Sequence, residues 1–317
     1  MKYFNRKKWY YLIINFCITY KIINSQNILQ MLKLSSYLLF KIVYFLNKIF
    51  FLFFRRNFTG WLIFFLQEKS YKKIKLEDRN QITFFTPNNL VEWRVRTLLS
   101  KEPDTIKWID NFKKNEKIIF WDIGANIGLF SIYSAFKHRD NIKVIAFEPS
   151  SSNLRILTRN ISINNLSETI FVNQIALTNK KNVFLDMSEP EFIEGSSLNT
   201  FGEKYNFEGK VFSTKQRYKI LGTTIDDMIN KGYLDIPNYI KIDVDGIEHL
   251  ILEGGENLFN SNVIKSVLIE INENFKLQKD TVLNFMEGHN FKFIKKENTP
   301  ENLSKKFLKT FNYIFEK

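Results

Sequence analysis

Glycines and carboxylates in this chain follow short apolar runs that have the length of buried strands. One run ends in the turn Asp122–Gly128, where Gly124 and Gly128 let the backbone bend tightly and approach a ligand. The helix after such a turn offers its N-terminal amide groups to that ligand. A dinucleotide-binding turn would continue with glycines where Asn126 and Leu129 stand, so the spacing argues against a dinucleotide.

Two acidic residues are placed to hold the two ends of a different ligand. Asp122, at the tip of the first predicted strand, can hold the cationic amino group of an amino-acid-like ligand. Glu148, at the tip of the next strand, can accept hydrogen bonds from both ribose hydroxyls of a nucleoside. An amino-acid end joined to a ribose end describes S-adenosylmethionine. The structural alternative for Asp122 is to cap the helix that begins after Gly124.

Further acidic residues follow the later strands and could serve as a general base. Removing the proton of an alcohol acceptor during methyl transfer requires a carboxylate or His within reach. Asp243, which ends a predicted strand, is our first candidate, and Glu270, at the tip of the strand after it, is the second. Asp245 and Glu248 have an equally good structural interpretation, as the N-cap of the next helix and its third-position partner.

Strand and helix patterns alternate along the second half of the chain. This alternation predicts an α/β fold, a doubly wound, mostly parallel seven-stranded sheet of the Rossmann-like kind, with ligands bound at the carboxyl ends of the strands. The last two strands should pair antiparallel. The predicted strands of this sheet are residues 118–121, 143–147, 169–175, 239–242, 266–271, 291–294 and 311–315, and the predicted helices are residues 89–100, 104–112, 127–136, 152–164, 224–230, 246–258 and 279–287.

The same patterns divide the chain into an arm and a globular domain. Residues 1–70 form a basic, aromatic-rich helical arm, and residues 71–317 form the domain. Within the domain, residues 77–117 are a lead-in segment, residues 118–317 are the Rossmann-like core, and residues 180–220 are an insertion in that core.

The net charge of +13 belongs wholly to the N-terminal part. Residues 1–75 hold fourteen basic side chains and one acidic one, so the remaining residues are balanced. A balanced domain has no overall excess with which to neutralise a phosphate backbone, which makes a nucleic-acid partner an unfavoured expectation. A single Cys and three His without metal-ligand spacing predict no metal site. We expect His249 on a helix surface and His138 and His289 in loops.

The arm favours contact with an anionic membrane surface through residues 1–66. Residues 37–54 contain Lys41 and Lys48, and residues 49–66 contain Arg55-Arg56 near their middle, so we expect no clean membrane span. The start carries no small-residue cleavage site of a signal peptide. On a helix over residues 28–54, six polar residues share one stripe about 140° wide and apolar residues fill the rest. This stripe consists of Gln30, Lys33, Ser36, Lys41, Asn47 and Lys48. The predicted location is cytoplasmic, peripheral at the membrane; the alternative is a helix packed on the domain.

Several ordered motifs resemble the FkbM family of methyltransferases over about residues 80–295. They are Asp122–Ser131, Ala146–Pro149, Ile240–Glu248 with Leu252–Gly255, Leu268–Ile271, and the approach from Pro87 through Trp93-Arg94 and Lys101–Pro103 to Trp108-Ile109. The resemblance implies a class I methyltransferase fold, S-adenosylmethionine as methyl donor, and O-methylation of a sugar, a glycan or another small acceptor. One departure is Asp245, where the family more often has Glu.

The resemblance also implies which residues contact the cofactor. These are Asp122, Gly124, Asn126, Gly128 and Glu148, with Asn153 as a weaker candidate. It leaves Asp243 and Glu270 as the catalytic candidates. Two other functions remain open at this stage: an RNA methyltransferase on the same fold, and a non-catalytic module that binds the cofactor or a membrane.

Overall fold

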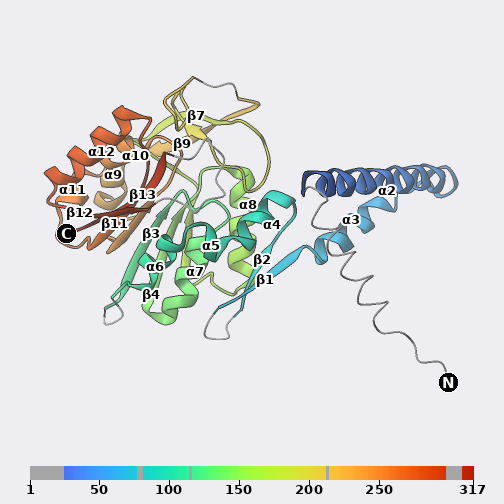
Figure 1. Ribbon diagram of the computed structural model, residues 1–317, viewed down its shortest axis with the longest axis horizontal. Coiled ribbons are helices and arrows are strands. Elements are labelled where there is room, and N and C mark those ends of the chain that lie inside the picture. Colours follow the sequence, from blue (N-terminus) through green and yellow to red (C-terminus); the bar gives the residue numbers. More distant parts are fainter. Residues whose placement is uncertain (1–24, 77–80, 114–115, 212–213, 298–308) are drawn as a thin grey trace, which may run out of the picture. The chain divides into compact units, whose positions relative to one another are not determined.

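The structure is a computed structural model that describes residues 25–76, 81–113, 116–211, 214–297 and 309–317 (Figure 1). The chain separates into two compact units, Met1–Lys69 and Ser70–Lys317. Each unit has its own set of internal contacts.

In the first unit, α2 (Ser25–Phe54) and α3 (Thr59–Glu68) form a helical hairpin whose turn is held by one side chain. Asn47 Oδ1 accepts hydrogen bonds from the N–H groups of Phe58 and of the residue after it, at 3.0 and 3.3 Å. Its Nδ2 donates to Asn57 Oδ1 at 2.8 Å. Asn47 is therefore buried in the hairpin turn, whereas the sequence placed it on the solvated polar stripe of α2.

The length of α2 bears on one expectation about the arm. Residues Asn27–Phe54 form one helix that is long and apolar enough to cross a membrane, by length and composition only. The helix still contains Lys33, Lys41 and Lys48, so the expectation of no clean membrane span stays a prediction. The large apolar side chains of α2 and α3 are mostly exposed within the described part of the arm.

The second unit is built on the predicted seven-stranded sheet, in the order β12-β13-β11-β10-β3-β4-β5. β3, β4, β5, β10 and β11 pair in parallel, and β13 runs antiparallel to both of its neighbours, as predicted for the last two strands. The doubly wound, mostly parallel sheet is confirmed. Its strands are β3 (Ile118–Ile123), β4 (Ile142–Phe147), β5 (Ile170–Asn173), β10 (Tyr239–Ile242), β11 (Ser266–Asn272), β12 (Lys292–Glu297) and β13 (Thr310–Glu316).

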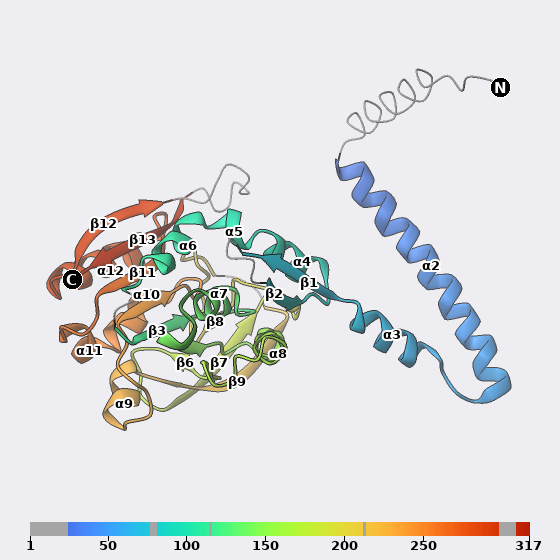
Figure 2. The same ribbon diagram turned by 90° about the horizontal axis from the view of Figure 1, so that it is seen from below.

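Helices cover both faces of this sheet (Figures 1 and 2). Phe120 and Trp121, consecutive residues of β3, point into two separate apolar cores because side chains alternate along a strand. The core around Phe120 includes side chains of α4, α6, α7 and α8, and the core around Trp121 includes side chains of α9 to α12. The helices of this unit are α4 (Asn89–Arg96), α5 (Leu98–Lys101), α6 (Pro103–Asp110), α7 (Leu129–His138), α8 (Ser151–Ile163), α9 (Ile225–Asn230), α10 (Glu248–Glu253), α11 (Glu256–Asn260) and α12 (Lys276–Gly288), with a short 3-10 turn at Arg139–Asn141.

Two smaller sheets flank this core. The hairpin β1 (Tyr71–Lys75) and β2 (Gln81–Phe85) precedes the lead-in helices. The predicted insertion, residues 180–220, lies within a slightly longer segment that folds as a four-stranded sheet in the order β6-β9-β7-β8. Its strands are β6 (Ala176–Leu177), β7 (Val183–Glu189), β8 (Thr200–Phe201) and β9 (Gln216–Thr223).

Two helices that the sequence predicted as continuous are interrupted. The helix expected over residues 246–258 is divided into α10 and α11 at Gly254 and Gly255. A Cβ on Gly254 would lie 2.2 Å from the carbonyl oxygen of Thr178, so the backbone packs there and turns. The helix expected over residues 89–100 is likewise divided, at Thr97.

Two histidines also differ from expectation. His249 lies on α10 but is buried, and so is His138, which is the last residue of α7 rather than a loop residue. His138 Nε2 lies 2.8 Å from the carbonyl oxygen of Ile109, so its ring joins α7 to α6. His289 follows the end of α12, as expected.

Candidate active site

The switch point of the sheet lies between β3 and β10, because the chain leaves β3 toward β4 on one side and later returns to β10 on the other. The turn after β3 closes on the end of β10. A Cβ on Gly124 would lie 1.9 Å from the carbonyl oxygen of Asp243, and the φ of Gly124 is +85°. Only glycine permits this approach. Gly128, also with φ +85°, then begins α7.

Two cavities meet at this switch point. One, the narrow cavity, has a volume of about 60 Å³ and includes Glu148 in its wall. The other, the wide cavity, has a volume of about 380 Å³ and lies between the lead-in helices and the ends of β3, β10 and β11. Their shared wall consists of Gly124, Asn126, Ser197, Asp243 and Asp245.

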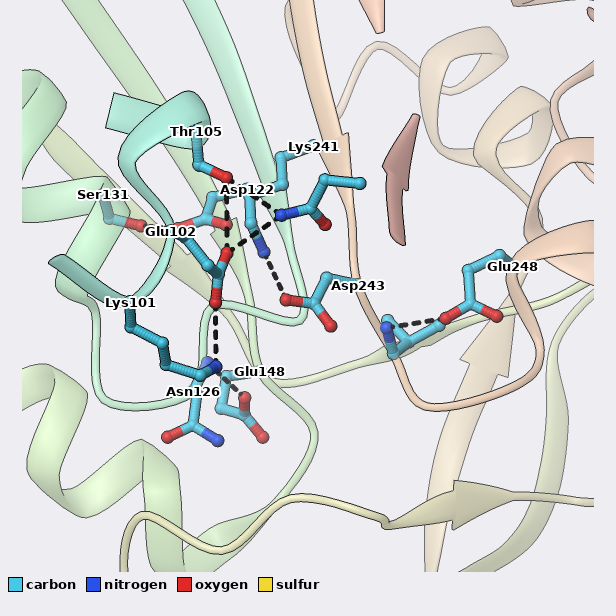
Figure 3. A network of polar contacts seen from close by, with 12 residues as sticks. Lys101, Glu102, Thr105, Asp122, Asn126, Ser131, Glu148, Lys241, Asp243 and Glu248 are labelled. Atoms are coloured by element: carbon cyan, nitrogen blue, oxygen red, sulfur yellow. Dashed lines mark hydrogen bonds and ion pairs between the residues drawn. The ribbon is translucent and has the colours of Figure 1, made fainter. Parts of the chain in front are cut away.

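A buried lysine stands among carboxylates beneath the wide cavity (Figure 3). Lys241 Nζ lies 2.7 Å from Asp243 Oδ2, and its side chain is only 1% exposed. Lys241 and Asp122 are register partners on β10 and β3. Burial alone would lower the pKa of Lys241, but the carboxylates of Asp243, Asp122 and Glu102 raise it instead. The lysine is thus a permanent cation that holds Asp243.

Asp122 lies below the cavities rather than in their walls. Its Oδ2 accepts a hydrogen bond from Ser131 Oγ at 2.5 Å, and its Oδ1 has no partner among the residues that the structure describes. Burial raises the pKa of Asp122, while Lys241 and Ser131 act in the opposite direction.

Glu102 supplies a second fixed charge in the wall of the wide cavity. Its Oε1 lies 2.9 Å from Lys101 Nζ, and its Oε2 accepts from Thr105 Oγ1 and Asn312 Nδ2, each at 3.3 Å (Figure 3). Burial raises the pKa of this carboxyl, but Lys101 and Lys241 outweigh burial and lower it to about 2. Glu102 is therefore ionised at neutral pH.

Glu270 and Asp245 also line the wide cavity, but their pKa values are raised, whereas that of Glu102 is lowered. Burial raises the pKa of Glu270 well above its usual value, and the nearby carboxylates of Asp243 and Asp245 raise it further. Burial and Asp243 also raise the pKa of Asp245, to about 6, against a hydrogen bond from the N–H group of Leu198. The wide cavity thus combines one carboxyl group whose pKa is lowered with two whose pKa values are raised.

Glu148 forms the acidic end of the narrow cavity. Its Oε2 accepts from the N–H group of Asn126 at 2.6 Å, and its Oε1 accepts from the N–H group of Ser150 at 2.8 Å. Burial raises the pKa of Glu148 to about 7, although these two N–H groups favour the ionised form. Each oxygen keeps a lone pair for a further donor.

A segment of the insertion, residues 194–198, crosses from one cavity to the other, and we call it the strap. Asn126 Nδ2 and Asn153 Nδ2 donate to the carbonyl oxygen of Ser196 at 2.9 and 3.0 Å, and Asn153 Oδ1 accepts from the N–H group of Gly195 at 2.8 Å. On the other side, Arg94 Nε donates to the carbonyl oxygen of Gly195 at 2.5 Å. The strap therefore uses the amides of two residues that were predicted to contact a cofactor.

The loop that carries Asp243 and Asp245 is held from inside by Glu248. The carboxylate of Glu248 accepts from the N–H groups of Val244 and Gly246 at 3.1 to 3.2 Å and from Gln278 Nε2. The interpretation of Asp245 as an N-cap was wrong, because α10 begins only at Glu248 and Asp245 has a φ of +64°. Its Oδ2 instead accepts from the N–H group of Leu198 in the strap, at 2.6 Å.

Comparison with known proteins agrees with this geometry. Residues 122–293, just over half of the chain, match the model of the Methyltransferase FkbM domain. The chain belongs to the FkbM methyltransferase family. The match starts at Asp122 and ends in β12, so this FkbM domain includes the strand tips, the wall of the narrow cavity and the insertion. The side of the wide cavity that α4 and α5 form lies outside the match.

Two curated proteins and one solved structure illustrate the similarity. The FkbM chain is 28% identical to the hexuronic acid methyltransferase AglP of Haloferax volcanii, over 59% of this chain and 69% of that one. It is 25% identical to the methyltransferase sdnD of Sordaria araneosa, over 51% of this chain and 68% of that one. The crystal structure of methyltransferase FkbM from Methylobacillus flagellatus aligns with a TM-score of 0.44 and 18% identity, over 64% of this chain and 44% of that one.

The structure gathers most of the predicted site residues of this FkbM domain at the switch point. Gly124, Asn126, Glu148, Asn153, Asp243 and Glu270 line one or both cavities, Gly128 begins α7, and Asp122 lies beneath them. Their individual roles stay predictions. Lys241 stands out in the sequence as a charged residue within a buried strand. Sequence reasoning missed Glu102, whose partners come from three separate elements, and Thr200 of β8, which is buried in the wall of the narrow cavity.

Proposed function

We propose that this methyltransferase uses S-adenosylmethionine and methylates an oxygen of a sugar or glycan acceptor. The observation that carries the proposal is the meeting of the two cavities at Gly124 and Asp243. The narrow cavity, with the buried carboxylate of Glu148, would hold the nucleoside, and the wide, acid-lined cavity would hold the acceptor. The methyl group would pass between them where the two cavities meet. The FkbM family and the hexuronic acid relative support the same class of reaction.

The residues of the narrow cavity fit this cofactor. The two oxygens of Glu148 can each accept one ribose hydroxyl in addition to their backbone donors. Gly124 lets a ligand approach the backbone, and Asn126, in the shared wall, lies between the ribose side and the acceptor side. When bound, S-adenosylmethionine supplies an electrophilic methyl group on a sulfonium sulfur.

Asp243 is the residue that we propose as general base. It lines both cavities, and Lys241 occupies its Oδ2, so Oδ1 is available to take the proton of the acceptor hydroxyl. Glu270 is better suited to donate a hydrogen bond, because its raised pKa favours the protonated carboxyl. Most of the rate should come from aligning acceptor and methyl group in a site that excludes water.

The wall of the wide cavity suits a sugar. The ring of Trp93, 39% exposed, offers an apolar surface to one face of a sugar ring. Carboxyl groups on the opposite wall can pair with hydroxyls. Arg94 and Lys101 also line this cavity, and their positive charges could pair with the carboxylate of an acidic sugar. A hexuronic acid, named for the Haloferax volcanii relative, is such a sugar.

Calorimetry and a transfer assay on the full-length protein test this proposal. We expect S-adenosylhomocysteine to bind and NADH not to bind. Among neutral and uronic oligosaccharides given with labelled methyl donor, at least one should be methylated. Asp243→Asn should lower kcat by about 10²- to 10⁴-fold with little change in S-adenosylhomocysteine affinity. Asp186→Asn, a surface acid paired with Lys219, is the control. Absence of S-adenosylhomocysteine binding, or normal turnover by Asp243→Asn, would contradict the proposal.

For the arm, we propose that the α2–α3 hairpin lies in the interface of an anionic membrane. Its described surface is largely apolar, and Lys41 and Lys48 extend over the rings of Tyr37 and Tyr44, at 5.2 and 5.0 Å from the ring centroids. A spanning helix would place Lys41 near the bilayer centre, at a cost of about 2.5–3.5 kcal/mol. A helix in the interface keeps its lysines in contact with lipid phosphates.

Vesicle flotation of the full-length protein tests this placement. Lys41→Glu/Lys48→Glu should release the protein from vesicles that contain anionic lipid, whereas the charge-matched Lys180→Glu/Lys181→Glu, on exposed residues of the second unit, should not. Alkaline carbonate should also release the wild type. Retention through carbonate would show a spanning helix, and equal binding of both double variants would refute the role of the stripe.

A further inference from the structure

The narrow cavity contains two polar atoms that nothing in the described structure satisfies. Asn199 Oδ1 and Thr200 Oγ1 are both buried and have no hydrogen-bond partner among the described residues. Both residues line the narrow cavity, and the side chain of Thr200 is only 2% exposed. Buried polar atoms without partners cost free energy and are uncommon in folded proteins, so a pair of them in one cavity wall is a place where the polar groups of a ligand can bind.

The rest of that wall has the character of a site for a flat aromatic ring. Phe147, Leu177, Met187, Phe201 and Ile251 supply apolar surface around the two polar residues. Glu148 marks the ribose end. A nucleoside base fits this wall: it is attached to a ribose, its flat faces are apolar, and its polar edge can bond to the amide oxygen of Asn199 and the hydroxyl of Thr200.

We infer that Asn199 and Thr200 of the insertion recognise the purine edge of the cofactor, an inference that rests on the proposed use of S-adenosylmethionine. The amide of Asn can accept from the exocyclic N6 amino group of adenine and donate to a ring nitrogen beside it, a pairing with adenine that asparagine forms readily. The Thr200 hydroxyl can donate to, or accept from, the same edge. Base selection thus belongs to Thr200 at the start of β8 and to the residue before it, outside the seven-stranded sheet.

The position of Thr200 is fixed by the sheet of the insertion. Thr200 pairs with Ser188 and Phe201 pairs with Met187, across β7 and β8. The ring of Phe201 lies over Gly222 of β9, where an added Cβ would be 2.4 Å from two ring atoms. The two polar groups therefore stand on a packed support, which is what a specific hydrogen-bonding site requires.

The volume of the narrow cavity adds one condition. About 60 Å³ holds a few water molecules but not a purine, so the base can enter only if part of the wall moves outward. Ser196 and Ser197 of the strap line the cavity but belong to no paired strand, and they are the part of the wall that we expect to move, while Asn199 and Thr200 stay in place.

Binding of two nucleosides by the full-length protein tests the inference. S-adenosylhomocysteine carries the N6 amino group, and S-inosylhomocysteine has a carbonyl oxygen in its place. By calorimetry, we expect the wild type to bind the adenosyl compound at least about tenfold more tightly. Asn199→Ala and the nearly isosteric Thr200→Val should each reduce this ratio by about three- to tenfold. The control Ser188→Ala, which alters β7 without touching the cavity wall, should keep it.

Each outcome separates this inference from the proposed function. If the wild type binds neither compound, the use of S-adenosylmethionine is refuted. If the wild type binds but does not discriminate, or if both variants discriminate as well as the wild type, the assignment of Asn199 and Thr200 is wrong while the function stands. Thermal melting identifies folded variants, and Asn199→Ser replaces Asn199→Ala if the latter fails to fold.

Discussion

Replacing Lys241 by methionine should destabilise the protein strongly and in a pH-dependent way. The side chain is 1% exposed and pairs with Asp243 at 2.7 Å, and Asp122 and Glu102 also raise its pKa. Removing one partner of a buried ion pair leaves an uncompensated charge and costs about 3–5 kcal/mol. Because the side chain of Asp243 is 25% exposed and water can reach it, we expect the lower end, about 3 kcal/mol at pH 7.5.

The loss should shrink when the pH falls to 5.5. In the wild type, the raised pKa keeps Lys241 charged at both pH values, so its contribution is constant. In the variant, the buried carboxylates can regain neutrality by binding a proton, which favours the folded state at low pH. Stability of Lys241→Met relative to the wild type should therefore decrease as the pH rises.

Urea unfolding at the two pH values measures both effects. The control is Lys143→Met on β4, which β3 separates from β10; this lysine is 33% exposed and pairs with Asp235 at 2.5 Å. Such a surface pair is worth less than about 1 kcal/mol. The reasoning would be refuted if Lys241→Met loses no more unfolding free energy than Lys143→Met does, or if its loss is the same at both pH values.

Three further predictions concern the strand tips. Since burial raises the pKa of Glu148 to about 7, S-adenosylhomocysteine affinity measured by calorimetry should rise about tenfold from pH 6 to pH 8, and Glu148→Gln should show a flat, weak profile. Gly124→Ala should lower the stability by more than about 2 kcal/mol, because its Cβ would lie 1.9 Å from a backbone oxygen at φ +85°; an unchanged thermal midpoint would contradict the close approach. Glu248→Gln should lower the free energy of unfolding in urea by about 1–3 kcal/mol, because the NH₂ group of an amide cannot accept the hydrogen bonds that the loop N–H groups now donate to the carboxylate. An unchanged free energy of unfolding would show that other contacts hold the loop.

The elements that could be predicted from sequence are those whose signals are local. β3 and β4 were recognised because each is an apolar run, buried on both faces, that ends in a turn with glycine or proline. The same locality identified Gly124, Glu148 and Asp243, since the tips of parallel strands collect at one edge of the sheet.

The features that were missed depend on contacts between distant segments. The break between α10 and α11 results from the approach of Gly254 to Thr178, which no helical pattern reveals. His249 is buried because α12 and Phe275, the residue before α12, pack on α10, although its neighbours in sequence look like those of a surface helix. The partners of Glu102 come from α5, α6 and β13, so its depressed pKa has no local signature.

The strap links the affinities of the two cavities. Ser197 lines both of them, Asp245 in the shared wall accepts from the N–H group of Leu198, and Arg94 in the wide cavity donates to Gly195. A nucleoside that displaces the strap therefore also rearranges the donors and acceptors that an acceptor sugar meets. Thermodynamic reciprocity then requires each ligand to change the affinity of the other by the same factor. The acceptor should therefore stay in the wide cavity for a time that depends on whether the nucleoside is bound. In this way the strap alone would set the order in which substrates bind and products leave.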